Sequence, residues 1–166
     1  LRYRDASNFS SNKIFLPHVI MKKKKLIIEF EKLLINSPLN NFNDLYVANH
    51  PLKLKSKIHL SMKSEIEEIM KIYQNRFSKN SLNNNTSIFF GVTAAIFEAL
   101  EKGNKAIHIC AEPLFETHSE KIWPNLKVNQ LGKYTFQYNL IRLGKYIRFG
   151  NKEKMLFQIL RKTTQI

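Results

Sequence analysis

The stretch "TSIFFGVTAAIFEALEKGNKAIHICAEP", residues 86–113, constrains the fold of this chain more than any other. An apolar run at residues 87–90 is followed by a turn of small residues, an amphipathic run that ends at Gly103, and a second apolar run. This pattern predicts a strand, a turn, a helix over residues 93–102 and a second strand at residues 106–110. Because both strand-like runs are apolar throughout, we expect them in a parallel sheet that is covered on both faces.

Other segments extend this alternation. A helix follows the lysine run at residues 22–25, since apolar residues recur at helical spacing until Ser37 and Pro38 stop it. Residues 45–48 are typical of a buried strand, and a helix that starts at Ser64 has Glu67 in the capping-box position. Residues 52–63 alternate enough for a short strand or a loop, and the pattern leaves both open. The remaining expectations are loops over residues 1–20, strands near residues 127–130 and 146–149, and a last helix near residues 152–161.

Strands that alternate with helices of about a dozen residues are typical of doubly wound α/β domains. We therefore predict a Rossmann-like parallel sheet within residues 21–166, with residues 1–20 as an irregular segment that links it to a missing N-terminal half. A chain of 166 residues with 43% hydrophobic content is large enough for one such core. The sequence contains no apolar stretch long enough to span a membrane, and we expect a cytoplasmic protein.

The formal net charge of +14 requires an explanation. It favours partners that carry phosphates: nucleic acid, an anionic membrane surface or a phosphorylated substrate. An equal alternative is a genome bias toward lysine, asparagine and isoleucine, with the lysines on solvated faces. Lysine greatly outnumbers arginine, which carries most base and bidentate phosphate recognition, so we do not expect a nucleic-acid partner. Peripheral contact with the inner face of an anionic membrane stays open.

Residues that often carry chemistry are few. The single cysteine, Cys110, excludes an internal disulfide and a cysteine-built metal site, and its apolar neighbours predict an inert core thiol. His108 alternates within the same apolar run and is expected to be a satisfied core residue. The sequence has no signature of a zinc protease, a serine hydrolase, a P-loop or a Rossmann dinucleotide site. We therefore expect no cofactor and no metal requirement.

Two turns follow strands at the edge where open α/β sheets bind their ligands. One is "ANHP", which contains His50 and Pro51, and the other is "FGVTAA", which contains Gly91, Thr93 and Ala94. Small residues before a helix let a ligand approach the backbone, and the first helical N–H groups favour an anion. The Thr93 hydroxyl adds a donor, so this turn suits a phosphate. The simpler alternatives are a threonine that caps a helix and a His-Pro pair that only ends a strand.

The succession of "YVANHP", "TSIFFGVTAAIFEALEKGNKAIHI" and "PLFETHSEKIWP" resembles the C-terminal, nucleotide-sugar-binding domain of GT-B glycosyltransferases. The likeness covers roughly residues 24–149 and is closest to bacterial surface-polysaccharide enzymes, including sialyltransferases and polysialyltransferases that use a CMP-sugar. The resemblance implies that His50 and Thr93 hold the nucleotide phosphate, with His50 as the catalytic residue, and that Glu98 faces the donor ribose. Ala94 and Ala95 follow Thr93, where such sialyltransferases usually have a second hydroxyl residue.

The resemblance also implies a partner set of a nucleotide sugar and a glycan acceptor. The acidic motif that supplies the general base in the N-terminal domain of these enzymes has no counterpart here, so we expect donor binding without transfer. Two alternatives stay open. One is a teichoic-acid-type phosphotransferase with a CDP-linked polyol donor, and the other is a non-enzymatic basic module that binds nucleic acid or anionic lipid. The basic module predicts lysines that cluster with exposed aromatic residues on one face.

Overall fold

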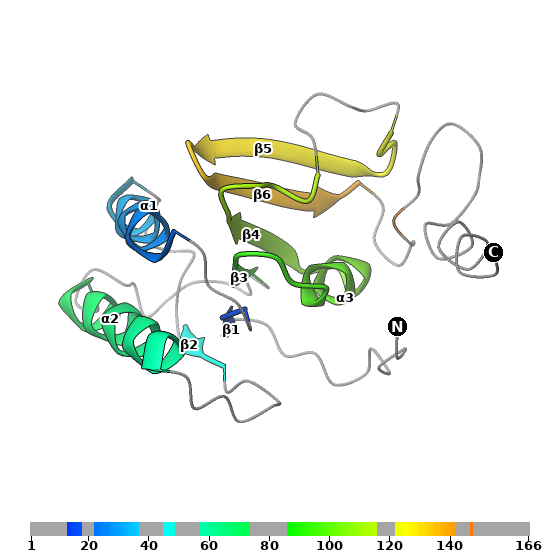
Figure 1. Ribbon diagram of the computed structural model, residues 1–166. Helices are drawn as coiled ribbons and strands as arrows, with labels where there is room; N and C mark the ends of the chain where they lie inside the picture. Colours follow the sequence, from blue (N-terminus) through cyan, green and yellow to red (C-terminus); the bar gives the residue numbers. More distant parts are fainter. Residues whose placement is uncertain are drawn as a thin grey trace, which may run out of the picture.

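The computed structural model describes residues 13–17, 22–36, 45–48, 57–73, 86–115, 122–141 and 147, which form an α/β fold around a six-stranded sheet (Figure 1). The elements in chain order are β1 (Lys13–Phe15), α1 (Lys23–Asn36), β2 (Tyr46–Val47), α2 (Lys57–Tyr73), β3 (Thr86–Phe90), α3 (Ala95–Glu101), β4 (Lys105–Ile109), β5 (Leu126–Gly132) and β6 (Thr135–Leu140). The order across the sheet is β2-β1-β3-β4-β6-β5. The α/β class predicted from the sequence is confirmed.

The sheet is mixed. β2, β1, β3 and β4 run parallel, as predicted, whereas β6 pairs antiparallel with β4 and β5 pairs antiparallel with β6. The expectation of a wholly parallel sheet is therefore wrong for the β5–β6 hairpin. β5 is an edge strand in which Leu126 alone is buried, and such half-exposed strands are usual in antiparallel pairs.

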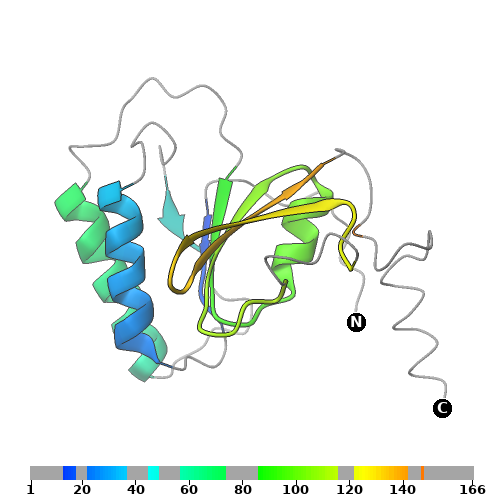
Figure 2. The same cartoon turned by 90° about the horizontal axis from the view of Figure 1, so that it is seen from above.

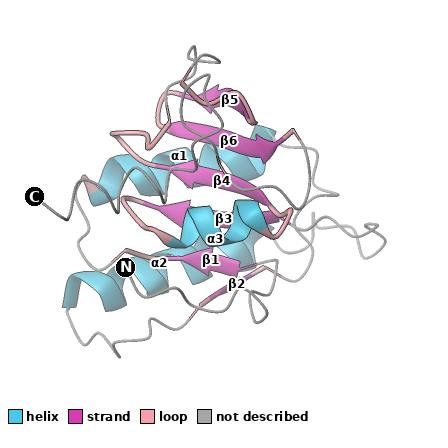
Figure 3. Cartoon of the chain, turned by 90° about the vertical axis from the view of Figure 1, so that its right-hand side faces the viewer, coloured by secondary structure: helices cyan, strands magenta, loops and turns pink. Residues whose placement is uncertain are grey.

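Helices cover both faces of the sheet, as Figures 2 and 3 show. α1 and α2 lie on one face and share a core with Ile88 and Phe90 of β3. α3 lies on the other face and shares the second core with Phe89. Successive side chains of a strand point to opposite faces, so β3 supplies both cores and is buried along its whole length. Within the described residues, none of the helices combines the length and apolar character needed to cross a membrane.

The crossover connections differ in hand. The chain crosses the sheet in opposite directions from β1 to β2 and from β2 to β3, yet α1 and α2 lie on the same face. The β1–α1–β2 and β2–α2–β3 crossovers therefore have opposite handedness. The β3–α3–β4 crossover has the same handedness as β1–α1–β2, because both its direction across the sheet and the face of its helix are reversed. Since nearly all such crossovers are right-handed, β2–α2–β3 is the exception. On this shared face α1 contacts β4, β5 and β6, and α2 packs beside β2.

Two further predictions are corrected, and one strand was missed. β1, expected in a loop, is a strand between β2 and β3, and three residues are too few to show a period. α2 begins at Lys57, so residues 57–63 are helical and Ser64 lies exposed inside the helix. The buried stripe of α2 already includes His59 and Met62, which explains the earlier start. β6 was not predicted, and the strand and helix expected beyond residue 145 lie outside the described residues, apart from the buried Ile147.

Glu29 joins α1 to the β5–β6 turn. Its Oε2 accepts hydrogen bonds from the Tyr134 N–H (3.0 Å) and the Thr135 hydroxyl (3.2 Å), and its Oε1 accepts one from Lys32 Nζ (3.4 Å). A Cβ atom at Gly132 would lie 2.8 Å from Oε2, so glycine makes this approach possible. Burial alone would raise the pKa of Glu29, but the hydrogen bonds outweigh burial and the pKa is lowered.

Glu29→Ala should lower the free energy of unfolding by about 1–3 kcal/mol, because the buried Thr135 hydroxyl and the half-buried Tyr134 N–H lose their acceptor. The pKa of this carboxyl is lower in the folded than in the unfolded chain. Its contribution is therefore complete above the unfolded pKa and is lost as the pH falls through the folded pKa. In urea unfolding experiments, the wild type should have a higher free energy of unfolding than Glu29→Ala near pH 7, and this difference should disappear as the pH falls to about 2. Glu67→Ala, which removes an exposed carboxylate, is the control. An advantage that is the same at every pH would contradict this role.

Candidate functional site

The carboxyl ends of the four parallel strands meet at one edge of the sheet, which we call the carboxyl edge. The described residues that leave the strands there are Pro17 after β1, Ala48 after β2, Gly91 after β3 and Cys110 after β4. Backbone hydrogen bonds hold two of them: Ala48 N donates to Ile14 O at 2.8 Å, and Gly91 N donates to Ile109 O at 2.9 Å. Both turns predicted to bind a ligand therefore start at this edge.

The direction of the strand order reverses between β1 and β3, because β2 lies on the far side of β1 and β4 on the far side of β3. Ligands of open α/β sheets bind at such a reversal, outside the carboxyl ends of the strands. Pro17 and Gly91 meet there, and a Cβ atom at residue 91 would lie 2.9 Å from Pro17 Cγ. Gly91 also has a φ of +60°. Backbone conformation and close approach both select glycine at this position.

Thr93 lies in the turn between Gly91 and α3. The helix begins at Ala95, two residues later than predicted, with Ala94 as its N-cap. Thr93 Oγ1 accepts a hydrogen bond from the Ala95 N–H at 3.3 Å, although the N-cap residue is Ala94 and makes no side-chain cap hydrogen bond. A hydroxyl that accepts a hydrogen bond still has its own hydrogen to donate. Because Val92 and Ala94 on either side are exposed, the turn is open to a ligand.

The structure places the predicted site residues in part. Gly91, Thr93 and Ala94 lie in one turn at the carboxyl edge, and Glu98 follows, half-buried, in the first turn of α3. His50 and Pro51 lie outside the described residues, and Ala48, two positions before His50, is held at this edge. The structure therefore brings the "FGVTAA" turn and Glu98 together at one end of α3. The participation of the His-Pro pair stays a prediction.

Sequence reasoning missed a group of lysines beside this edge. The connection from β1 ends at Lys22, and α1 starts there with Lys23, Lys24 and Lys25 and no acidic residue in its first turn. Lys23 bonds to Glu65 and Ser61 of α2, whereas Lys24 and Lys25 are exposed. The lysine run is plain in the sequence, but its place at the carboxyl edge follows only once β1 is known. Lysines at a helix N-terminus favour an anion there.

His108 of β4 connects the core to the Gly91 turn. Its Nε2 lies 2.7 Å from Gly91 O, and its Nδ1 lies 3.0 Å from the Tyr138 hydroxyl. A carbonyl can only accept, so Nε2 carries the hydrogen and Tyr138 donates to Nδ1. Burial lowers the pKa of His108 to about 4, and burial raises the pKa of Tyr138. The prediction of a satisfied core histidine is confirmed, and the structure adds that it fixes the Gly91 carbonyl.

Cys110 follows β4 and has no features of a nucleophile. Its thiol is buried, and Sγ donates a hydrogen bond to Glu112 O at 3.0 Å. Burial raises the pKa of Cys110, and the nearby Lys22 only partly offsets this. The prediction that this thiol lies in the core is confirmed. Across the part of the chain that the structure describes, no group of three or more His, Cys, Asp or Glu residues is placed to hold a metal ion.

A pocket of about 390 Å³ lies away from the carboxyl edge. It is lined by Trp123, Pro124, Leu126, Lys127 and Ile141, where β5 begins and β6 ends. The turn of the β5–β6 hairpin is at the carboxyl edge, since Tyr134 O accepts a hydrogen bond from Cys110 N at 2.9 Å. The open end of the hairpin, and the pocket with it, therefore lies at the opposite edge of the sheet.

No family model matches the chain, and the comparisons with curated proteins and with solved structures found no match. A functional proposal must therefore come from the geometry of the carboxyl edge and from the resemblance in the sequence.

Protonation of His108 should destabilise the fold. The pKa is about 4 in the folded chain and 6.5 by default, so the unfolded chain binds the proton first. The contribution of neutral His108 is complete above pH 6.5 and is lost as the pH falls to about 4, at a cost of about 3 kcal/mol. Urea unfolding across this pH range should show a smaller loss for His108→Gln, which does not titrate. Tyr138→Phe, which keeps the imidazole, is the control and should retain a steep pH dependence. Parallel curves for the wild type and His108→Gln would exclude this role.

Gly91→Ala should lower the free energy of unfolding by about 1–3 kcal/mol, because a positive φ and the contact with Pro17 both oppose a side chain. Pro17→Ala removes the closest atom, Cγ, keeps Cβ at 3.4 Å, and does not alter the positive φ that residue 91 must adopt. In a double-mutant cycle, Gly91→Ala should therefore cost less in the Pro17→Ala background but should not become neutral. Equal costs in the two backgrounds would show that Pro17 does not constrain the turn.

Proposed function

We propose that this chain binds a nucleotide sugar through its phosphate at the carboxyl edge and is the donor-binding domain of a glycosyltransferase that builds a bacterial surface glycan. The observation that supports this best is the reversal of strand order between β1 and β3. It gathers Pro17, the Gly91 turn and the lysine-bearing start of α1 at one place. α/β sheets with such a reversal bind phosphorylated ligands there.

Each part of the edge has a role in this proposal. The Gly91 turn lets a phosphate approach the backbone, and the Thr93 hydroxyl donates a hydrogen bond to it. Lys24 and Lys25, exposed in the first turn of α1, supply positive charge at the end of the helix that starts from the carboxyl edge. Glu98, further along α3, faces the ribose, as the resemblance implies. A ligand held in this way lies against rigid backbone and meets few side chains that must be ordered on binding.

His50 has the chemical role. It follows Ala48, the last described residue of β2's turn, by two positions. In this role its imidazole donates a hydrogen bond to the phosphate and, when protonated, gives a proton to the departing nucleotide. The acceptor hydroxyl must lose a proton to a base within hydrogen-bond reach. The resemblance assigns that base to another domain, so the chain alone binds the donor without transferring the sugar.

A nucleotide screen tests the binding site. At least one of CMP, CDP, UDP and GDP at low-millimolar concentration should raise the melting temperature, since a ligand at ten times its Kd adds about 1.4 kcal/mol to the stability. Amide resonances of Gly91 and Thr93 should shift with it, whereas those of Leu126 and Ile141 at the opposite edge should not. If none of the four nucleotides changes either the melting temperature or these amides, the site is misassigned.

Substitutions then test the individual roles. His50→Ala should weaken nucleotide binding by roughly 1–3 kcal/mol, and Thr93→Val should weaken it less. Thr93→Ser, which keeps the hydroxyl, should bind as the wild type does, and Ser64→Ala on the exposed side of α2 is the control. Glu98→Gln should weaken nucleoside binding and leave binding of inorganic phosphate unchanged. Equal affinities in all variants would remove the roles taken from the resemblance.

A further inference from the structure

The outward side of α1 has an unusual composition. The exposed residues of this helix are Lys24, Lys25, Ile28, Lys32, Ile35 and the terminal Asn36. The helical repeat places the first five in one stripe, opposite the buried Leu26, Phe30 and Leu33. We call these five residues the α1 stripe. Ile28 and Ile35 are 51% and 50% exposed, and the Lys32 side chain is 62% exposed.

No carboxylate is exposed on α1, all of which the structure describes. Glu29 is buried beneath the β5–β6 turn. Glu31 is half-buried and accepts a hydrogen bond from the Tyr73 hydroxyl at 3.2 Å. α2 differs, because it exposes Glu67 and Glu68 together with its lysines. The surface of α2 is therefore balanced in charge, whereas the α1 stripe is positive and apolar.

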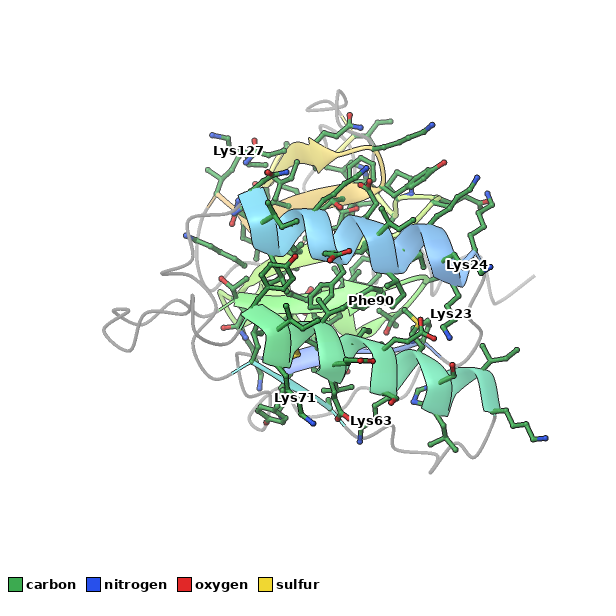
Figure 4. All side chains as sticks on the ribbon, turned by 90° about the vertical axis from the view of Figure 1, so that its left-hand side faces the viewer. Lys23, Lys24, Lys63, Lys71, Phe90 and Lys127 are labelled. Carbon is green, nitrogen blue, oxygen red and sulfur yellow. The ribbon has the colours of Figure 1, made fainter. Side chains whose placement is uncertain are left out.

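Positive charge extends beyond the stripe. Figure 4 looks onto this face, with Lys23 and Lys24 at one end of α1, Lys127 of β5 beyond the other end, and Lys63 and Lys71 on α2. Lys23 and Lys63 are paired with Glu65 and Glu67, and Lys32 is paired with the buried Glu29. The positive charge of α1 that these three ion pairs do not match is that of Lys24 and Lys25, and Lys127 adds to it on the β5 side.

We propose that the α1 stripe docks this chain on an anionic lipid surface. Each lysine held near such a surface raises the partition coefficient by about fivefold, and Ile28 and Ile35 enter the boundary between headgroups and acyl chains. The stripe has no aromatic residue on which a base could stack, and among the described residues Tyr46 alone is both aromatic and a large exposed hydrophobic side chain. Aliphatic side chains among lysines fit lipid better than they fit nucleic acid.

Vesicle binding tests the proposal. The chain should cosediment with phosphatidylcholine vesicles that contain about 30% phosphatidylglycerol, should not cosediment with pure phosphatidylcholine, and should be released as salt screens the charge. Combined substitution of Lys24, Lys25 and Lys32 by Gln should lower the partition coefficient on the order of 100-fold. Ile28→Gln with Ile35→Gln should lower it by about tenfold without any change of charge.

Matched controls separate position from net charge. Replacing Lys57, Lys71 and Lys105 by Gln removes the same charge from exposed positions outside the stripe, and Ile72→Gln with Ile141→Gln removes two exposed isoleucines. Both controls should bind vesicles within about threefold of the wild type. Unfolding in urea verifies that all four variants are folded. A control lysine variant that loses as much binding as the stripe variant would overturn the proposal.

Two other results would also overturn it. If the stripe variants lose affinity for a single-stranded oligonucleotide and keep their affinity for vesicles, the face binds nucleic acid. If the Ile28→Gln, Ile35→Gln variant turns a dimer into a monomer in analytical ultracentrifugation while vesicle binding stays the same, a second copy of the chain covers the face.

Discussion

The ladder between β3 and β4 is the constraint on which the rest of the structure depends. It pairs Thr86–Phe90 with Lys105–Ile109 over five positions, and all of these residues except Lys105 are buried. Ile88 and Phe90 point into the core under α1 and α2, and Phe89 points into the core under α3. β1 pairs with one side of this ladder and β6 with the other. Without the ladder, the half of the sheet with β1 and β2 would separate from the half with β5 and β6, and both cores would lose the strand that they share.

The ladder also fixes the carboxyl edge. Gly91 and Cys110 leave it there, and His108 within it holds the Gly91 carbonyl while Tyr138 holds His108. The turn is thus supported from beneath by a neutral imidazole and from the side by Pro17. A neutral imidazole can occupy this place because the hydrogen bonds at both nitrogens offset part of the cost of burial. A turn fixed in this way loses little conformational entropy when it binds a ligand.

The sequence predicts the parts of this structure whose signal is local. The β3–α3–β4 unit follows from a long apolar pattern, and Gly91 and Thr93 follow from small residues between a strand and a helix. β1 has three residues, and its position is set by pairing with strands that are distant in the sequence. The bonds of His108 reach residues 17 and 30 positions away, and those of Glu29 reach residues 105 and 106 positions away. No local pattern specifies such partners, so they become apparent only in the folded chain.

α1 links the two proposed surfaces physically. It starts at the carboxyl edge, and Lys24 and Lys25 belong both to that start and to the α1 stripe. A helix with its side chains is about 10 Å across, so a lipid surface against the stripe would lie roughly one Debye length from the inner side of α1. Lipid headgroups that neutralise Lys24 and Lys25 reduce their attraction for a phosphate, and the headgroups themselves repel it. If the chain binds both ligands as proposed, the two equilibria would therefore be negatively coupled, and by linkage the lipid and the phosphate would weaken each other's binding by the same factor.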